Sequence, residues 1–185
     1  MRKLFSFNMV TLDGFFEGPN REIDWHHVDE EFNQFAVEQT SAVDALLFGR
    51  VTYQLMASYW PTSIAVQDDP IVADLMNRLP KLVFSRTLEK AEWNNTTLIK
   101  DHIAEEISKL KQQTGKDLAL FGSANLMFTL MQMDLIDEHR IMVNPVILGS
   151  GTPLFKVSQK LNLKLVRTRT FGNGNVLLCY QPDRR

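Results

Sequence analysis

Short apolar runs that stop at a glycine or serine and then give way to a helix-like segment recur along this chain. Three of them are ALLF before Gly49, LVF before Ser85 and LALF before Gly122. Continuous apolar runs of this kind are typical of strands buried on both faces of a mostly parallel sheet, with right-handed crossovers. The alternation therefore predicts an α/β fold.

The N-terminal part shows a strand, a turn and a helix. Residues 3–10 are expected to form a strand that ends at the turn Asp13–Gly14. Apolar residues at helical spacing, from Val28 through Phe35 to Gln39, predict the first helix.

Capping and terminating residues mark the other helices. Asp69 followed by Pro70 is typical of a helix start, and we expect Ile71, Leu75 and Leu79 to form the buried stripe of that helix. Further helices are expected after Gly49, before Gly115 and after Gly122.

The pattern changes beyond about residue 139. Residues 140–148, 163–171 and 175–181 read as strands that are joined by glycine-rich turns, with too little chain between them for helices throughout. An antiparallel C-terminal edge is implied. The sequence thus predicts one domain over residues 1–185, a three-layer α/β/α fold whose mixed sheet is mostly parallel.

Composition excludes several classes of protein. The net charge of −2 and the scattered basic residues disfavour a nucleic-acid-binding protein. One cysteine, Cys179 in an apolar run, allows neither an intrachain disulfide nor a cysteine-based zinc site, and no metal site is expected. No apolar stretch is long enough for a membrane helix. We expect a cytoplasmic protein that acts on a small molecule.

The three junctions at Gly49, Ser85 and Gly122 are the best candidates for a ligand site. In a parallel sheet, ligands bind beyond the carboxyl ends of the strands, where helix N-termini offer free N–H groups. Arg50 and Arg86, beside two of these junctions, match phosphate oxygens. The alternative is that each glycine merely ends a strand and that the arginines are solvated.

Two familiar nucleotide-binding motifs are missing from the chain. It contains no GxxxxGK[ST] loop and no complete Gly-x-Gly-x-x-Gly fingerprint, because Gly149-Ser150-Gly151 lacks the third glycine. A P-loop NTPase and a Rossmann dehydrogenase are therefore poorly supported.

The order of several motifs resembles the dihydrofolate-reductase-like superfamily over nearly the whole chain. The resemblance is strongest to the reductase domain of the riboflavin-biosynthesis deaminase/reductase and its stand-alone relatives. The motifs that carry it are Leu12-Asp13-Gly14, residues 47–53 (LFGRVTY), residues 83–86 (VFSR), residues 121–124 (FGSA) and residues 144–155 (NPVILGSGTPLF).

The resemblance implies NADPH bound across the sheet. In such a complex Arg50 and Thr52, beside Gly49, would hold the pyrophosphate, and Ser85 with Arg86 would flank the 2′-phosphate. The loop Leu12-Asp13-Gly14 would close over the nicotinamide. The residues expected beneath the pyrophosphate and the nicotinamide ribose are Gly122, Ser123, Ala124 and Asn125.

Ser123 departs from the family pattern. Dihydrofolate reductases carry a Gly-Gly pair where this chain has Gly122-Ser123, so a side chain enters the place of close backbone approach. Its hydroxyl could instead donate to a phosphate.

Glu31 and Asp13 are the candidate catalytic residues. Folate-reducing relatives place a carboxylate on the first helix, and the four-residue spacing from Glu31 to Phe35 resembles theirs. The alternative is that the acids at this helix start only complement the helix dipole. His26 and His27 could line a substrate pocket or donate a proton, or lie at the surface.

The sequence therefore predicts an NADPH-dependent reductase that transfers hydride to a C=N or C=O bond of a small heterocyclic substrate. The resemblance suggests a reaction like that of 5-amino-6-(5-phosphoribosylamino)uracil reductase in riboflavin biosynthesis. Residues 15–32 are acidic, however, where a phosphorylated ribose would favour arginine or lysine. Alternatives are a non-catalytic nucleotide-binding protein on the same scaffold and a dihydrofolate reductase proper. The apolar C-terminal strands suggest a homodimer.

Overall fold

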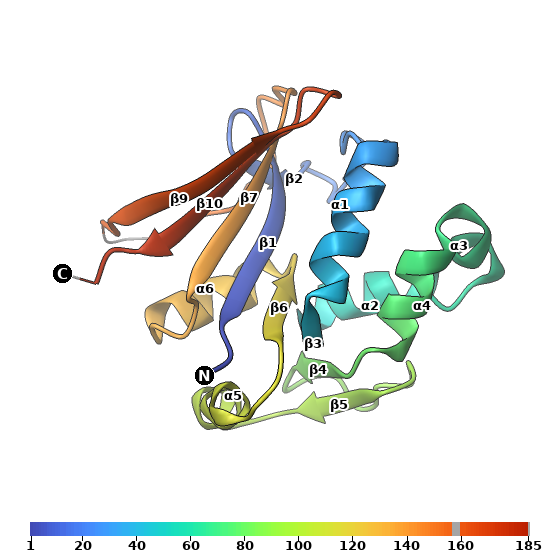
Figure 1. Ribbon diagram of the computed structural model, residues 1–185, viewed down its shortest axis with the longest axis vertical. Helices are drawn as coiled ribbons and strands as arrows, with labels where there is room; N and C mark the ends of the chain where they lie inside the picture. The colour runs from blue at the N-terminus through green and yellow to red at the C-terminus, as the bar shows by residue number, and fades with distance from the viewer. Residues whose placement is uncertain (157–159, 185) are drawn as a thin grey trace.

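A sheet of eight strands forms the centre of the computed structural model, which describes residues 1–156 and 160–184 (Figure 1). The strand order is β5-β4-β3-β6-β1-β7-β10-β9. The first six of these strands run parallel to one another, whereas β10 is antiparallel to both β7 and β9. The mostly parallel sheet with an antiparallel C-terminal edge is thereby confirmed. The strands are β1 Leu4–Thr11, β3 Val43–Gly49, β4 Lys81–Phe84, β5 Thr96–Ile99, β6 Asp117–Phe121, β7 Glu138–Asn144, β9 Leu163–Thr170 and β10 Val176–Pro182.

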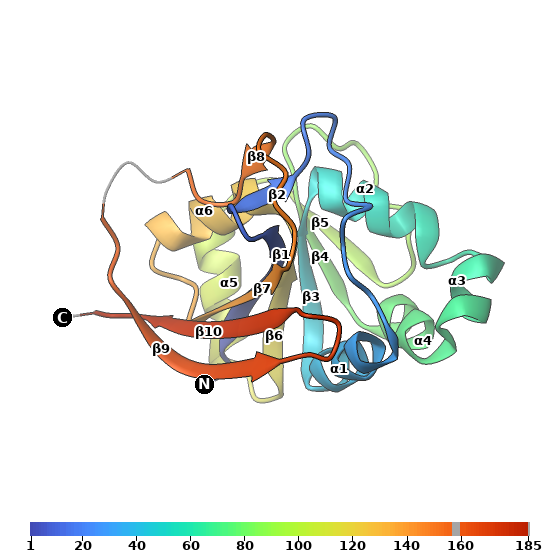
Figure 2. The same ribbon diagram turned by 90° about the horizontal axis from the view of Figure 1, so that it is seen from above.

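Helices cover both faces of the sheet, which gives the three expected layers (Figure 2). One face carries α1 and the run α2 to α4, and the other carries α5 and α6. The helices are α1 Glu30–Ser41, α2 Arg50–Tyr59, α3 Ser63–Asp68, α4 Pro70–Arg78, α5 Ile103–Gln112 and α6 Ala124–Gln132.

The side chains of β3 are buried on both faces of the sheet, which explains its continuous apolar sequence. Ala45 and Leu47 pack into the cluster beneath α5 and α6, whereas Leu46 and Phe48 pack into the cluster beneath α2 and α4. Because successive side chains of a strand point to opposite faces, both faces of a central strand must be apolar when helices cover both.

The first helix begins later than its apolar spacing suggests. Asp29 is the N-cap, and its carboxylate accepts a hydrogen bond of 2.9 Å from the backbone N–H of Phe32. Val28 lies before this cap and is 54% exposed, so its expected place on the buried face of the helix was wrong. The capping residue, rather than the apolar period, fixes where the helix starts.

Helix α4 begins as expected, with Asp69 as N-cap and Pro70 at its first position. Of its expected buried stripe, Leu75 and Leu79 are indeed buried, but Ile71 is not. Ile71 is 59% exposed, while Val72 and Met76 are buried, which corrects the expectation for Ile71.

Three short elements were not expected from the sequence. They are α3 and the two strands of a small second sheet, β2 Phe15–Glu17 and β8 Thr152–Pro153. The strands β2 and β8 pair antiparallel and so connect the segment after β1 with the segment after β7. Gly151 permits this pairing, because any Cβ there would collide with the backbone carbonyl of Glu17.

Candidate functional site

The three predicted junctions lie at the ends of neighbouring strands, at one edge of the sheet. Helices begin after β3 and β6, whereas residues 85–95 after β4 form a loop that leads to β5, which corrects the helix-like segment expected after Ser85. In the parallel pairing, Gly49 at the end of β3 is opposite Phe84, the last residue of β4. The end of β6 lies on the other side of β3, and Phe121 is opposite Phe7 of β1. The structure therefore brings the predicted residues at Gly49, Ser85 and Gly122 to the carboxyl ends of adjacent strands.

Ser123 connects two of these junctions directly. Its Oγ accepts a 2.9 Å hydrogen bond from the backbone N–H of Gly49, and its own backbone N–H donates to Thr52 Oγ1 at 3.0 Å. Oγ also lies 3.4 Å from the carbonyl oxygen of Phe121, to which it donates. The hydroxyl that we considered as a phosphate donor is thus used within the protein, and it holds the start of α2 against the start of α6.

The backbone at Gly122 and Ser123 is left-handed, with φ angles of 59° and 57°. A Cβ at Gly122 would lie 3.1 Å from Thr52 Cγ2. Glycine suits this position because it adopts the left-handed conformation easily and brings no side chain against Thr52. The Gly122 carbonyl accepts a 3.0 Å hydrogen bond from Asn8 Nδ2, and Phe16 of β2 lies nearby.

Asn8 and Phe16 were missed by sequence reasoning. Asn8 is 1% exposed, and its Oδ1 has no partner among the described residues. The signal for Asn8 was a polar residue within an apolar strand. Phe16 gave no signal, because β2 itself was not expected.

The helices that start at these junctions have open N-termini. Within the described residues, neither α2 nor α6 has a side-chain cap, and neither has an acidic residue in its first turn. Their first N–H groups and the positive ends of their dipoles are therefore available to an anion. Asn125 is exposed in the first turn of α6, beside Ala124.

The basic side chains at the edge are exposed and weakly held. Arg50 donates to Gln54 Oε1 at 3.2 Å, and Arg86 forms an ion pair of 3.4 Å with Asp101. The Arg86 side chain is 82% exposed, and ion pairs of that kind contribute little. Ser85 Oγ accepts from the backbone N–H groups of Thr87 and Leu88, which shapes the loop after β4.

Asp13 anchors the loop after β7. Its carboxylate accepts hydrogen bonds from Thr11 Oγ1 at 2.6 Å and from the backbone N–H groups of Leu148 and Gly149 at 3.3 and 2.8 Å. These bonds, of which that from Thr11 is the strongest, lower the pKa of Asp13. The carboxylate is therefore ionised at neutral pH, and Gly14 follows it with a φ of 88°.

Glu31 is engaged with the β9–β10 hairpin. Its Oε2 accepts a 2.8 Å hydrogen bond from the backbone N–H of Gly172, and its Oε1 lies 3.6 Å from Arg169 Nη2. Its catalytic role stays a prediction, as does that of Asp13.

The two adjacent histidines differ. Burial lowers the pKa of His26 to about 4, so this imidazole is neutral at physiological pH. The backbone N–H of His27 donates to Asn144 Oδ1 at 2.9 Å, which ties the segment before α1 to the end of β7.

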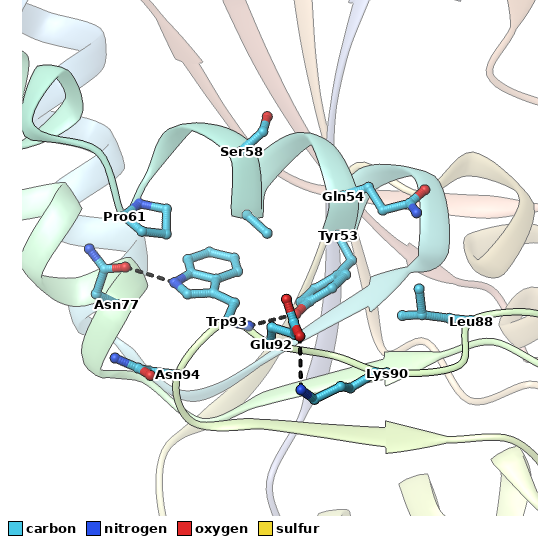
Figure 3. Close-up of a pocket in the computed structure, with 11 residues that line it drawn as sticks. Tyr53, Gln54, Ser58, Pro61, Asn77, Leu88, Lys90, Glu92, Trp93 and Asn94 are labelled. Atoms are coloured by element: carbon cyan, nitrogen blue, oxygen red, sulfur yellow. Dashed lines mark hydrogen bonds and ion pairs between the residues drawn. The ribbon is translucent and has the colours of Figure 1, made fainter.

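One cavity of the described residues lies away from these side chains. It encloses about 470 Å³ between α2 and the connection from β4 to β5, and Trp93 forms its floor (Figure 3). Trp93 Nε1 donates to Asn77 Oδ1 at 2.7 Å and its backbone N–H donates to the Tyr53 hydroxyl at 3.0 Å. None of the residues that we predicted for the site lines this cavity.

The described residues hold neither a metal-binding cluster nor a membrane-spanning helix. They contain no cluster of three or more histidine, cysteine or carboxylate side chains that could hold a metal ion. Nor does any helix among them combine the length and apolar character that spanning a bilayer requires.

Comparison with known proteins decides the family. The model of the RibD C-terminal domain matches residues 2–177. The chain belongs to the RibD C-terminal domain family. YyaP of Bacillus subtilis (strain 168), an uncharacterized protein, is 41% identical to this RibD-type chain over 174 residues, covering 92% of the chain and 90% of YyaP.

Solved structures confirm the dihydrofolate-reductase-like fold of this RibD-type domain. A putative riboflavin biosynthesis protein from Shewanella sp. PV-4 superimposes with a TM-score of 0.75 at 22% identity, covering 98% of this chain and 99% of the other. Dihydrofolate reductase from Enterococcus faecalis, in complex with NADP(H), gives a TM-score of 0.64 at 11% identity, with 98% and 96% covered. The RibD C-terminal match supports a reductase of the riboflavin-biosynthesis type.

Proposed function

We propose that this protein is an NADPH-dependent reductase that transfers hydride to a C=N or C=O bond of a small heterocyclic substrate. The observation that carries the proposal is the joined pair of open helix N-termini at α2 and α6, which Ser123 holds side by side. Two such N-termini suit the two phosphates of a dinucleotide. The NADP(H) complex of the E. faecalis reductase supports a nicotinamide cofactor on this fold.

The residues at the edge fit such a cofactor. Gly122 allows the left-handed turn between β6 and α6 and its close contact with Thr52, so the start of α6 lies beside that of α2. The N–H groups of Arg50 and Ala124 lie in the first turns of α2 and α6, and Arg86 is free to exchange its exposed ion pair for a 2′-phosphate. Bound NADPH would supply the hydride; the protein would orient the reacting groups.

The substrate would lie beside the ends of β1 and β7. Asp13 fixes the loop around Gly149 there, and Glu31 lies at the start of α1. We propose that these two carboxylates serve the substrate end of the site. Because both are hydrogen-bonded within the protein, a non-catalytic nucleotide-binding protein remains the competing proposal.

A binding experiment tests the cofactor site. NADPH should raise the melting temperature, and Arg86→Ala should weaken NADPH binding by about tenfold, the value of one charge-assisted hydrogen bond, while NADH binding stays unchanged. Arg78→Ala is the matched control, because Arg78 is an exposed arginine in an equivalent ion pair with Asp74. Absence of any thermal shift with NADPH would refute the proposal.

A turnover experiment separates the alternatives. Oxidation of NADPH is followed at 340 nm against pterins, pyrimidines and quinones. Cofactor binding without turnover of any of them favours the binding protein. Turnover of dihydrofolate that disappears in Glu31→Gln favours a dihydrofolate reductase proper.

A further inference from the structure

We infer that the substrate of this reductase carries no phosphate and is neutral or positively charged. The inference rests on the proposed function, because it concerns the substrate end of the same site. It follows from the way in which the donors at that end are occupied.

The loop after β7 has backbone donors that are already bound to an internal anion. Gly149-Ser150-Gly151 is a glycine-rich turn, and turns of this composition often bind phosphate through successive N–H groups. Here the N–H groups of Leu148 and Gly149 donate to the Asp13 carboxylate at 3.3 and 2.8 Å. Asp13 thus takes the place that a substrate phosphate would need.

Donors near Glu31, at the start of α1, are likewise already bound to carboxylates of the protein. Glu31 accepts from the backbone N–H of Gly172 and pairs with Arg169, whose Nη1 also lies 3.1 Å from Glu38 Oε2. The N-terminus of α1 is capped by Asp29. The N–H of Gly172, the Arg169 guanidinium and the start of α1 therefore each have a carboxylate of the protein itself as partner.

The remaining charge at this end is negative. Segments 144–155 and 171–175 hold no charged residue, and His26 is neutral at physiological pH because of its burial. Segment 11–31 holds a single basic residue, Arg21, against seven carboxylates, which are Asp13, Glu17, Glu22, Asp24, Asp29, Glu30 and Glu31.

The two ends of the site are built for opposite charges. At the cofactor end, α2 and α6 present uncapped N-termini without acids in the first turn, as far as the structure describes them. At the substrate end, α1 is capped and carries Glu30 and Glu31 in its first turn. A dianion would be repelled there, whereas a protonated C=N group would be attracted. In the reduction of such a group, the hydride of NADPH adds to carbon and the π electrons of the C=N bond become the lone pair of a neutral amine. NADP⁺ is the other product.

An NMR titration with inorganic phosphate tests the occupied donors. The protein is first saturated with NADP⁺, which should shift the amides of residues 49–52 and 122–125. Phosphate should then leave the amides of Leu148, Gly149 and Gly172 unchanged in the wild type. It should shift the first two in Asp13→Ala and the third in Glu31→Ala, but none of them in the control Asp74→Ala, whose carboxylate lies on α4.

Phosphate-dependent shifts of these three amides in the wild type would overturn the inference. If NADP⁺ shifts no amides of residues 49–52 and 122–125, that result counts against the proposed function. The effect of phosphate on Leu148, Gly149 and Gly172 is a separate measurement and still tests the inference.

A matched pair of substrates provides the second test. The compounds are 5-amino-6-ribosylaminouracil and its 5′-phosphate, which differ only in the phosphate. We expect the compound without phosphate to have a kcat/KM at least about tenfold higher, the ratio that 1.4 kcal/mol of differential binding gives. A ratio of one or less contradicts the inference. Where neither compound is reduced, the phosphate titration alone decides.

Discussion

Ser123 shows how a residue other than glycine can occupy a left-handed position at the start of a helix. Its backbone adopts the left-handed conformation that glycine favours, with φ at 57° and ψ at 54°. In exchange, its hydroxyl satisfies the N–H of Gly49, the N-cap residue of α2. A buried donor without a partner costs more than a typical hydrogen bond contributes, so this bond compensates for the backbone strain.

Substitutions of Ser123 should separate these two effects. Ser123→Ala loses the hydrogen bond and keeps the strain, and we expect it to lower the free energy of unfolding by about 1–3 kcal/mol. Ser123→Gly also loses the bond but relieves the strain, so it should be less destabilising by about 1 kcal/mol. Urea denaturation of both variants measures the difference. Equal stability of Ser123→Ala and the wild type would show that the bond to Gly49 contributes nothing.

At the scale of elements, the strands and helices with strong local patterns could be predicted from the sequence. The apolar runs before Gly49, Ser85 and Gly122 correctly located β3, β4 and β6, because central strands need apolar side chains on both faces. The elements α3, β2 and β8 were missed, since they contain only six, three and two residues and show no period.

The contacts of the candidate site were less accessible to sequence reasoning. The junction residues could be chosen because glycines and arginines follow apolar strands. The bonds from Gly172 to Glu31 and from Asn8 to Gly122 could not be foreseen, because each joins residues more than 100 positions apart. Such pairs depend on the register of distant strands rather than on a local pattern.

Strand β9 is the element through which we expect two copies to associate. It lies at the edge of the sheet, and within residues 1–156 and 160–184 it pairs with β10 alone. Its Leu163, Leu165 and Val166 are 37%, 48% and 42% exposed. Exposed apolar edge strands tend to pair with other chains.

Light scattering after size-exclusion chromatography should therefore give twice the chain mass of 21.3 kDa. Leu165→Lys should shift the protein toward the monomer, whereas Ile71→Lys, at an equally apolar exposed position on α4, should not. A monomeric wild type at micromolar concentration would contradict the homodimer.

At the scale of the whole molecule, one buried and one half-buried histidine, His139 and His26, connect folding to pH. His139 is 1% exposed, and its Nδ1 lies 2.9 Å from Ser6 Oγ. Burial lowers the pKa of both His139 and His26 to about 4, from the usual 6.5 of a histidine. Between pH 6.5 and pH 4 the unfolded chain binds more protons than the folded one. The contribution of these neutral histidines to the stability is therefore complete above pH 6.5 and is lost as the pH falls toward 4.

Denaturation in urea at about pH 7.5 and about pH 5 measures this dependence. Each histidine should account for a loss of about 2 kcal/mol at the lower pH. His139→Gln should make the loss smaller by that amount. An identical pH dependence in His139→Gln and the wild type would show that His139 does not titrate in this range on unfolding.

The small sheet of β2 and β8 belongs to a set of bonds that join two segments far apart in the sequence. The backbone N–H of Leu12 donates to Val146, that of Leu154 donates to Gly14, and Asp13 holds Gly149. The start of the chain and its last third are thereby fastened together above the ends of β1 and β7. Neither segment can lift away without breaking its bonds to the other, so a protease cut in one of them would also loosen its neighbour.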